Sequence, residues 1–183
     1  MGALKLEDIN YTYSDYKLWK GDWELIEGVP FAMSPAPVRI HQNIAYEIAR
    51  LLGNQVVDCQ ICEVLGEIDY KVNEETTLRP DVVLTCNDTG EAYLTKAPEI
   101  IVEIISKSTA KRDEVYKFDI YEKEKVKYYI IVYPDDFRAK VYKLDGKEYD
   151  KQGDFTSEIY SFEETTCKVS LDFEELFKRF KKK

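Results

Sequence analysis

Apolar residues recur at helical spacing in three stretches of the chain. The first is an amphipathic pattern that ends near Gly53-Asn54 and has its apolar positions at Ile40, Ile44, Ile48, Leu51 and Leu52. A second helix is predicted from Ser108 to about Glu124, where Thr109 can cap the start and the apolar side is formed by Val115, Phe118 and Tyr121. A short final helix is predicted around Leu171, Leu176, Phe177 and Phe180.

Runs rich in β-branched and aromatic residues predict strands between and after these helices. They span Val64 to Val72, Val82 to Thr85, Ile100 to Ile105, Val126 to Tyr133 and Ala139 to Leu144. Two short apolar runs on either side of Glu27-Gly28 predict an N-terminal hairpin, and the turn at Pro134 predicts another. Strands before and after the second helix form a βαβ-like unit, so we expect an α/β fold with an N-terminal hairpin extension.

Composition limits the size of the fold and the chemistry open to it. The 183 residues are 44% apolar, which predicts one domain over residues 1–183. The 26 basic and 35 acidic residues give a net charge of −9, which argues against a surface that binds nucleic acid all over, so a polyanion would need a local basic patch. A single histidine, His41, excludes metal sites built on several imidazoles.

The four cysteines are too few and too irregularly spaced to predict a disulfide framework. Cys59 and Cys62 form a C-x2-C pair, but a zinc-binding interaction domain would need Cys86 and Cys167 to complete it from far along the chain. We therefore expect buried or half-buried free thiols in a reducing compartment. Because the sequence contains neither a signal-peptide pattern nor a long apolar run, we expect a cytoplasmic protein that makes no membrane contact.

The most informative residue is an acid inside an apolar strand. Glu103 sits within the run from Pro98 to Ser106, where burying an ionised carboxylate without a partner would cost several kcal/mol. Its partner is either a structural Arg or Lys or a metal ion, and the strand alone does not decide between them.

A second acid, Asp81, starts the Val82-Val83-Leu84 run directly after Pro80. An aspartate in this position is often a turn residue. If its strand neighbours that of Glu103, the two carboxylates can bind one hard cation, and Mg²⁺ or Mn²⁺ in such a site would assist hydrolysis.

The second predicted helix adds a lysine to these acids. Asp113, Lys117 and Tyr121 are spaced i, i+4 and i+8 and share a face, although a solvated Asp–Lys pair fits the same spacing. Lys107, together with Lys111 and Arg112, competes for this role and supplies the most credible local patch for phosphate contact.

Other polar residues are less easily ranked. His41 and Glu47 border the apolar stripe of the first helix, where each could support a site at the sheet edge or simply be a satisfied boundary residue. Further acids near strands are Glu24, Glu27, Glu67 and Asp69, and their spacing does not order them.

Taken together in order, several of these segments resemble the Uma-type putative restriction endonuclease family, a branch of the PD-(D/E)xK nuclease superfamily. The resemblance runs from about Trp23 to Leu144 and rests on Trp23 to Gly28, Met33 to Pro37, His41 with Ile44, Arg79 to Val83, Val102 to Thr109, and Asp113 with Lys117 and Tyr121. It implies a restriction endonuclease-like mixed central β-sheet flanked by helices, and a homodimer.

The resemblance also implies roles for individual residues. Asp81 would be the motif aspartate and Glu103 the motif acid, both holding Mg²⁺ or Mn²⁺. The motif lysine would stand at Ile105, so its role falls to Lys117 on the following helix, which could orient or deprotonate the attacking water or stabilise charge. The function implied is a metal-dependent endonuclease that hydrolyses DNA. The alternative is a non-catalytic dimeric binding or regulatory module on the same fold.

Overall fold

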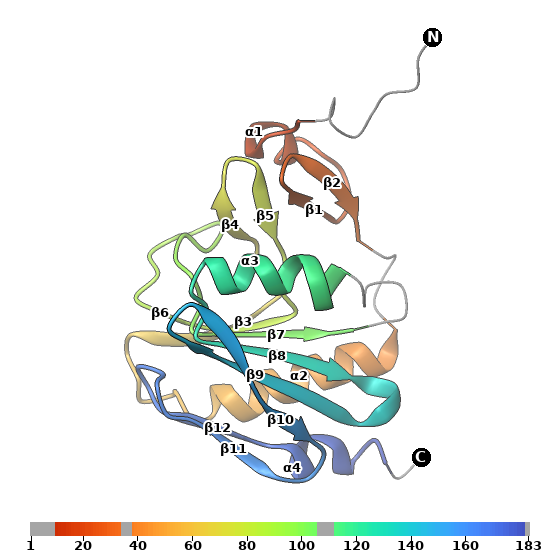
Figure 1. The fold of residues 1–183 in the computed structure, drawn as a ribbon, viewed down its shortest axis with the longest axis vertical. Coiled ribbons are helices and arrows are strands. Elements are labelled where there is room, and N and C mark those ends of the chain that lie inside the picture. The colour runs from red at the N-terminus through yellow and green to blue at the C-terminus, as the bar shows by residue number, and fades with distance from the viewer. Residues whose placement is uncertain (1–9, 34–37, 106–111, 182–183) are drawn as a thin grey trace.

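A six-stranded mixed sheet forms the centre of the protein (Figure 1). The computed structural model describes residues 10–33, 38–105 and 112–181. The strand order is β10-β9-β8-β7-β6-β3, with β7 and β8 parallel and every other neighbouring pair antiparallel. The strands are β3 (Cys62–Gly66), β6 (Val82–Cys86), β7 (Ile100–Ile104), β8 (Tyr128–Tyr133), β9 (Arg138–Asp145) and β10 (Glu148–Phe155).

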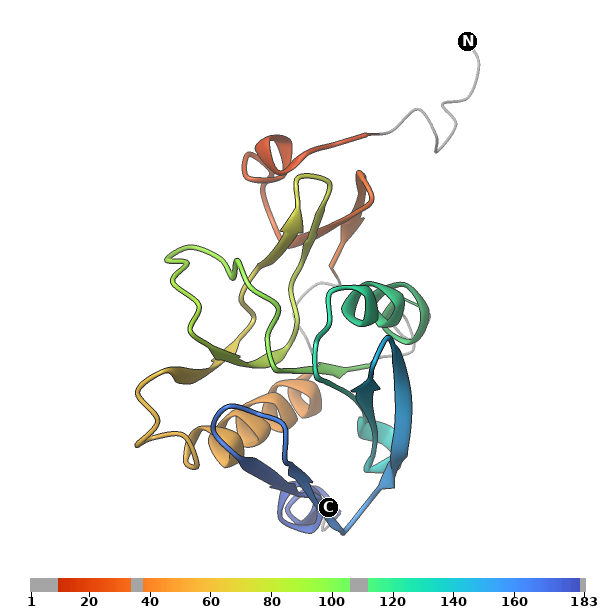
Figure 2. The same cartoon turned by 60° about the vertical axis from the view of Figure 1, so that its left-hand side comes forward.

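Helical segments cover the two faces of this sheet (Figures 1 and 2). On one face lie η2 (Arg112–Lys117), a π-helix, and α3 (Phe118–Lys123), which together connect the parallel strands β7 and β8. The βαβ-like unit is therefore confirmed. The opposite face is covered by α2 (Arg39–Gly53), α4 (Phe173–Lys178) and a two-stranded ribbon of β11 (Ile159–Phe162) and β12 (Val169–Asp172).

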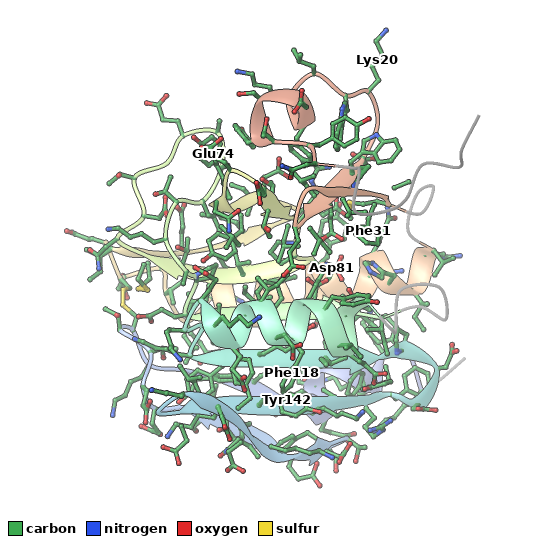
Figure 3. All side chains as sticks on the ribbon, turned by 45° about the horizontal axis from the view of Figure 1, so that its top comes forward. Lys20, Phe31, Glu74, Asp81, Phe118 and Tyr142 are labelled. Carbon is green, nitrogen blue, oxygen red and sulfur yellow. A yellow bond between two sulfur atoms is a disulfide. The ribbon has the colours of Figure 1, made fainter. Side chains whose placement is uncertain are left out.

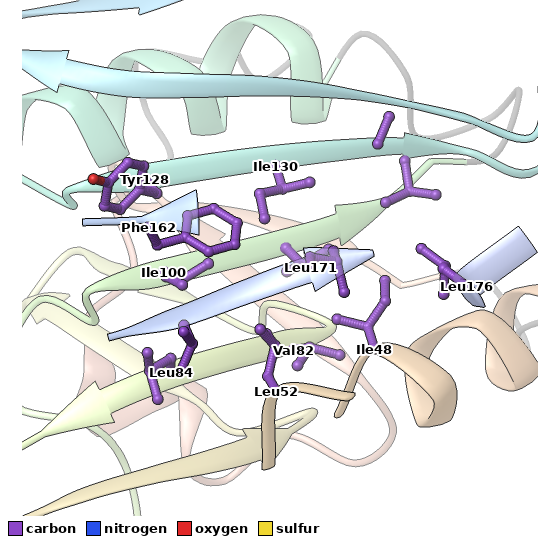
Figure 4. Packing of buried hydrophobic residues seen from close by; sticks show 14 of the residues in the cluster. Ile48, Leu52, Val82, Leu84, Ile100, Tyr128, Ile130, Phe162, Leu171 and Leu176 are labelled. Atoms are coloured by element: carbon purple, nitrogen blue, oxygen red, sulfur yellow. The ribbon is translucent and has the colours of Figure 1, made fainter. Parts of the chain in front are cut away.

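The alternating residues of the central strands fill two separate cores. On β6, Val82 and Leu84 pack in the core on the α2 side, whereas Val83 packs in the core on the α3 side. Figure 4 shows the first core, in which Ile48 and Leu52 of α2 meet strand residues and the ribbon. Because both faces are covered, the central strands are nearly continuous runs of apolar residues.

A second, smaller sheet carries the N-terminal hairpin. Its strand order is β2-β1-β5-β4, and a short helix, α1 (Tyr13–Tyr16), precedes it. The strands are β1 (Trp23–Ile26), β2 (Val29–Ala32), β4 (Tyr70–Asn73) and β5 (Thr76–Leu78). The predicted turn is confirmed at Glu27 and Gly28, which both have positive φ. Because β5 leads into β6 through Arg79 and Pro80, it joins the small sheet to the large one.

Several predicted elements differ from the structure. The predicted strand from Val64 to Val72 is two strands in different sheets, because the chain turns at Glu67, which adopts a φ of 49°. Leu171 belongs to β12 and not to the final helix, which begins after Asp172, the residue whose side chain accepts from the Glu175 amide at 2.9 Å. Val115 is exposed, because the charged side of its helix is the buried one. The start of that predicted helix at Ser108, with the cap Thr109, lies outside the described residues.

The prediction of free thiols is wrong, because the four cysteines form two disulfides. Pairing of β3 with β6 places Cys62 opposite Cys86, with their Cα atoms 4.0 Å apart. Cys59 bonds to Cys167 across 108 residues, because the segment before β12 returns to the connection between α2 and β3. No helix within the described ranges is long and apolar enough to cross a membrane.

Candidate active site

Asp81 and Glu103 meet at the start of β6 and the end of β7. The two strands are antiparallel with Val82 opposite Val102, so the next residues outward, Asp81 and Glu103, also stand opposite each other. Residues in such positions have Cβ atoms about 4.5–5.5 Å apart and side chains on the same face. The Ile104 amide donates to Asp81 Oδ2 at 2.7 Å and fixes that carboxylate beside the strand end. The sequence made a shared site conditional on these two strands being neighbours, and the structure shows that they are.

Lys117 lies at the centre of a buried group of carboxylates. Its Nζ is 2.7 Å from Glu24 Oε1, 2.8 Å from Glu103 Oε1 and 3.4 Å from Asp113 Oδ1. The lysine is 1% exposed, so the alternative of a solvated Asp113–Lys117 pair is wrong. Tyr121 donates its hydroxyl to the same Glu103 oxygen at 2.9 Å. Lys117 therefore supplies the cation that the strand acid requires.

The local backbone explains how one short segment delivers three polar groups inward. Asp113 and Lys117 lie on η2, whose turns are wider than those of an α-helix, and Tyr121 follows on α3. Tyr129 on β8 donates its hydroxyl to the Asp113 carbonyl oxygen at 2.9 Å, which ties the wide turn to the sheet. Such π-helical turns often mark functional sites.

The electrostatics of the group follow from its burial. Burial raises the pKa of Glu103 well above its ordinary value, although the Lys117 ammonium opposes the rise. For Lys117, burial acts to lower the pKa, but the attraction of Glu103, Glu24 and Asp113 outweighs it and raises the pKa. Lys117 therefore stays protonated at neutral pH. Three carboxyl groups thus surround one ammonium, and burial favours the neutral form of Glu103.

His41 approaches the site from α2. Its Nε2 lies 3.1 Å from Asp81 Oδ2, and both side chains are only slightly exposed. Burial acts to lower the pKa of His41, but the hydrogen bond to Asp81 and the charge of that carboxylate raise it overall. Its other ring nitrogen, Nδ1, is buried and has no hydrogen-bond partner within the described ranges. The imidazole thus orients the Asp81 carboxylate from α2.

Sequence reasoning could not rank Glu24, which the structure places inside the group. Glu24 lies on β1 and is fully buried, and its Oε1 also accepts from the Arg79 amide at 3.0 Å. That amide begins the short segment that leads to Asp81. The signal that could have found Glu24 is the one that identified Glu103, an acid within an otherwise apolar strand. The Arg79 side chain is held by Asp69 and Asp22, each at 2.7 Å.

Other residues singled out from the sequence lie elsewhere or cannot be placed. Glu47 forms ion pairs with Arg50 at 2.6 Å and Arg179 at 3.5 Å, which links α2 to the end of α4. Lys107 and Lys111 lie outside the described residues. Of the predicted supporting residues, the structure thus brings His41, Asp113 and Tyr121 to the site.

The donor atoms around Asp81 and Glu103 fit a hard divalent cation. Mg²⁺ and Mn²⁺ prefer carboxylate oxygens, and Glu24, Asp81 and Glu103 supply them from β1, the start of β6 and β7. The His41 imidazole, the Lys117 ammonium and the Tyr121 hydroxyl lie against these oxygens. Asp81 and Glu103 are the residues that would hold such an ion, and Glu24 reaches the same buried group through Lys117.

Comparison with known proteins bears on the fold and the family of the chain. Among curated proteins, none matches the chain. A solved structure, described as a putative nuclease belonging to DUF820 from Anabaena variabilis ATCC 29413, superposes with a TM-score of 0.73 at 17% sequence identity, covering 91% of this chain and 97% of that one. The likeness shows that the fold is restriction endonuclease-like, as predicted. Residues 13–173 match the family described as "Uma2: Putative restriction endonuclease". The chain therefore belongs to the Uma2 family of putative restriction endonucleases.

Proposed function

We propose that this protein is a Mg²⁺- or Mn²⁺-dependent endonuclease that hydrolyses phosphodiester bonds of DNA. The observation that carries the proposal is the convergence of Asp81 and Glu103 across β6 and β7, beside a buried Lys117. Two carboxylates at the ends of neighbouring strands, with a lysine beside them, are a set of groups suited to metal-assisted phosphoryl chemistry. Family membership supports the same reaction class.

Each residue of the site has a distinct task in this proposal. Asp81 and Glu103 hold the metal ion, which when bound activates water and offsets charge on the phosphate oxygens. Lys117 keeps its proton, so it stabilises the negative charge that develops on the phosphate and does not act as a base. Tyr121 fixes the rotamer of Glu103, and His41 fixes that of Asp81.

A groove that contains two arginines, at the N-terminal end of α2, supports a polyanionic substrate despite the net charge of −9. The groove has a volume of about 570 Å³ and is lined by Arg39, Ile40, Asn43, Phe137, Arg179 and Phe180. Arg39 and His41 both lie in the first turn of α2, so the groove begins at the helix end that also carries His41. We infer that Arg39 and Arg179 contact the DNA backbone, and that the enzyme works in the cytoplasm.

The cleavage test uses the full chain with plasmid, linear duplex and single-stranded DNA, with Mg²⁺, Mn²⁺ or EDTA. Asp81→Asn, Glu103→Gln and Lys117→Met should each lower cleavage about 100-fold or more. Glu163→Gln and Lys168→Met are matched controls, because these residues form an exposed ion pair at 3.1 Å, and they should leave cleavage unchanged. Equal activity of wild type and Glu103→Gln, or no metal-dependent cleavage of any substrate, would contradict the proposal.

One observation favours a second candidate function, a non-catalytic dimeric binding or regulatory module. Lys117 already pairs with Glu24, Glu103 and Asp113, so the group has a cation without a metal. Titration calorimetry separates the two functions. The enzyme should take up Mn²⁺ and lose that uptake in Asp81→Ala, whereas the binding module should bind DNA equally with and without metal. Light scattering tests the homodimer that both functions imply.

A further inference from the structure

All four cysteines of the chain gather at one end of the large sheet. Cys59 lies in the connection between α2 and β3, Cys62 begins β3, Cys86 ends β6, and Cys167 precedes β12. Cys86 is five residues along β6 from Asp81, about 17 Å at the rise of an extended strand. Figure 3 shows the sulfur–sulfur bonds at the left margin of the molecule, well away from Asp81. This group is therefore separate from the candidate active site.

The sulfur atoms are close enough to bind a single ion. The Sγ atoms of Cys59, Cys62 and Cys167 all lie within 4.8 Å of one another. The fourth, Cys86 Sγ, is joined to Cys62 in the disulfide, and these two sulfurs also lie within 4.8 Å of a carboxylate oxygen of Glu99. Four cysteine side chains from separate segments thus lie near one another, three of them mutually close and the fourth bonded to Cys62.

A tetrahedral zinc ion needs four sulfurs at a defined spacing. Zn–S bonds of about 2.3 Å at tetrahedral angles place the sulfurs about 3.8 Å apart. The two sulfurs of each disulfide are bonded in this structure, so each pair must separate to this spacing after reduction. Three of the four sulfurs already lie within 4.8 Å of one another, so the required movement is small.

The surrounding backbone holds the four residues in place. The Cys62 amide donates to the Cys59 carbonyl oxygen at 3.4 Å, which closes the turn of the C-x2-C pair. Glu99 accepts from the amide and the hydroxyl of Thr166, each at 2.7 Å, and this fixes the segment that carries Cys167. Lys127 Nζ lies 2.6 Å from Glu99 and places positive charge next to the group. Cys86 Sγ is 3.5 Å from the same carboxylate.

A surface hollow gives an ion access to the cysteines. A hollow of about 320 Å³ opens beside the group and is lined by Gln60, Ile61, Cys62, Glu63, Thr85, Asn87 and Asp88. Cys59, Cys86 and Cys167 are partly exposed, so reductant and metal can reach them.

We propose that Cys59, Cys62, Cys86 and Cys167 form a tetrathiolate zinc site when the chain is reduced. Two molecules of a dithiol reductant, such as those that keep cell interiors reducing, transfer four electrons and four protons to the two disulfides. The products are four thiols and two molecules of oxidised reductant. One Zn²⁺ then binds the four sulfurs and displaces four protons to solvent. The bound ion joins the α2–β3 connection, β3, β6 and the segment before β12.

The test measures metal uptake by the full chain, independent of any nuclease activity. Protein reduced with a phosphine is dialysed against Zn²⁺, and its metal content is determined by mass spectrometry. One zinc per chain is expected in the reduced protein and none in the disulfide form. Co²⁺ in place of Zn²⁺ should give the visible absorption of a tetrahedral tetrathiolate complex, a readout that needs no variant.

Variants then assign the ligands. Cys86→Ser and Cys167→Ser should each weaken zinc binding about tenfold or more, while Glu103→Gln should bind zinc like the wild type. Circular dichroism verifies that each variant is folded. The proposal is overturned if reduced, folded wild type takes up no zinc, if Co²⁺ gives no tetrathiolate spectrum, or if Cys86→Ser and Cys167→Ser retain wild-type affinity.

Discussion

Replacing Lys117 by methionine should destabilise the protein more than any other single charge removal at the site. At an effective dielectric constant of 20, the distances of 2.7 and 2.8 Å to Glu24 and Glu103 correspond to about 6 kcal/mol of gross attraction each, and 3.4 Å to Asp113 to about 5 kcal/mol. Desolvation and mutual repulsion of the carboxylates offset most of this. Breaking a buried ion pair by removing one partner costs about 3–5 kcal/mol.

Replacing Glu103, the partner of Lys117, should have a different effect. Glu103→Gln replaces a carboxyl group whose pKa is raised by burial and keeps an oxygen that can accept from Lys117 and Tyr121. We therefore expect its stability to stay within about 1 kcal/mol of wild type, or to rise. Both variants should lose cleavage. Glu103→Gln should lose activity and keep its stability, whereas Lys117→Met should lose both.

Thermal unfolding monitored by circular dichroism in EDTA measures the difference. A loss of about 3–5 kcal/mol corresponds to a fall in Tm of about 6–20 °C for a domain of this size. Lys168→Met, which removes an exposed partner of Glu163, should shift Tm very little, since such pairs contribute about 0–1 kcal/mol. If Lys117→Met melts with the wild type, or if Glu103→Gln costs as much as Lys117→Met, the assignment of Lys117 as the cation that stabilises the buried carboxyl groups is wrong.

Three further changes test other parts of the structure. The hydrogen bond from Arg50 lowers the pKa of Glu47 in the folded state. At pH values above the unfolded pKa of about 4.5, the free energy of unfolding of the wild type should therefore exceed that of Glu47→Gln by about 1 kcal/mol. That advantage should vanish as pH falls through the lowered folded pKa, and urea unfolding at several pH values measures it. Tyr121→Phe removes the hydroxyl that orients Glu103 and should lower cleavage about 10–100-fold, with initial rates on plasmid DNA as the readout. Leu52→Ala opens a cavity in the α2-side core and should cost about 2–5 kcal/mol in urea unfolding.

The sequence predicted those parts of the fold that depend on local pattern. The α2 helix, the hairpin at Glu27 and strands β6 to β9 each bury a clear apolar face, so their periodicity is visible in the residues. Strand β10 was missed because Glu148–Phe155 is mostly exposed, and its register depends on backbone pairing with β9. The ribbon of β11 and β12 was missed for a related reason, since its strands are only four residues long.

Within the candidate site, residues could be predicted from their own strands, but contacts between residues far apart in the sequence could not. Glu103 could be singled out because its own strand is otherwise apolar, and Asp81 because it starts the neighbouring run. Their meeting with Glu24, which lies far earlier in the sequence, is set by the pairing of β1 with β5 and could not be deduced from local spacing. The disulfide between Cys59 and Cys167, across 108 residues, was hidden for the same reason.

The buried charges themselves favour a functional origin for the group. Well-packed apolar residues in place of a buried ion cluster are often neutral or stabilising by about 1–4 kcal/mol, so stability alone does not explain the cluster. The acids differ in their exposure to solvent, since the side chain of Asp81 is 12% exposed and that of Glu103 is 4%. A cation arriving from solvent would therefore meet Asp81 and His41 first and Glu103 second. Asp81→Asn should accordingly weaken metal uptake more than His41→Gln, because only Asp81 contributes a charged ligand; the opposite order in calorimetry would make the histidine, and not the carboxylate, the residue that admits the ion.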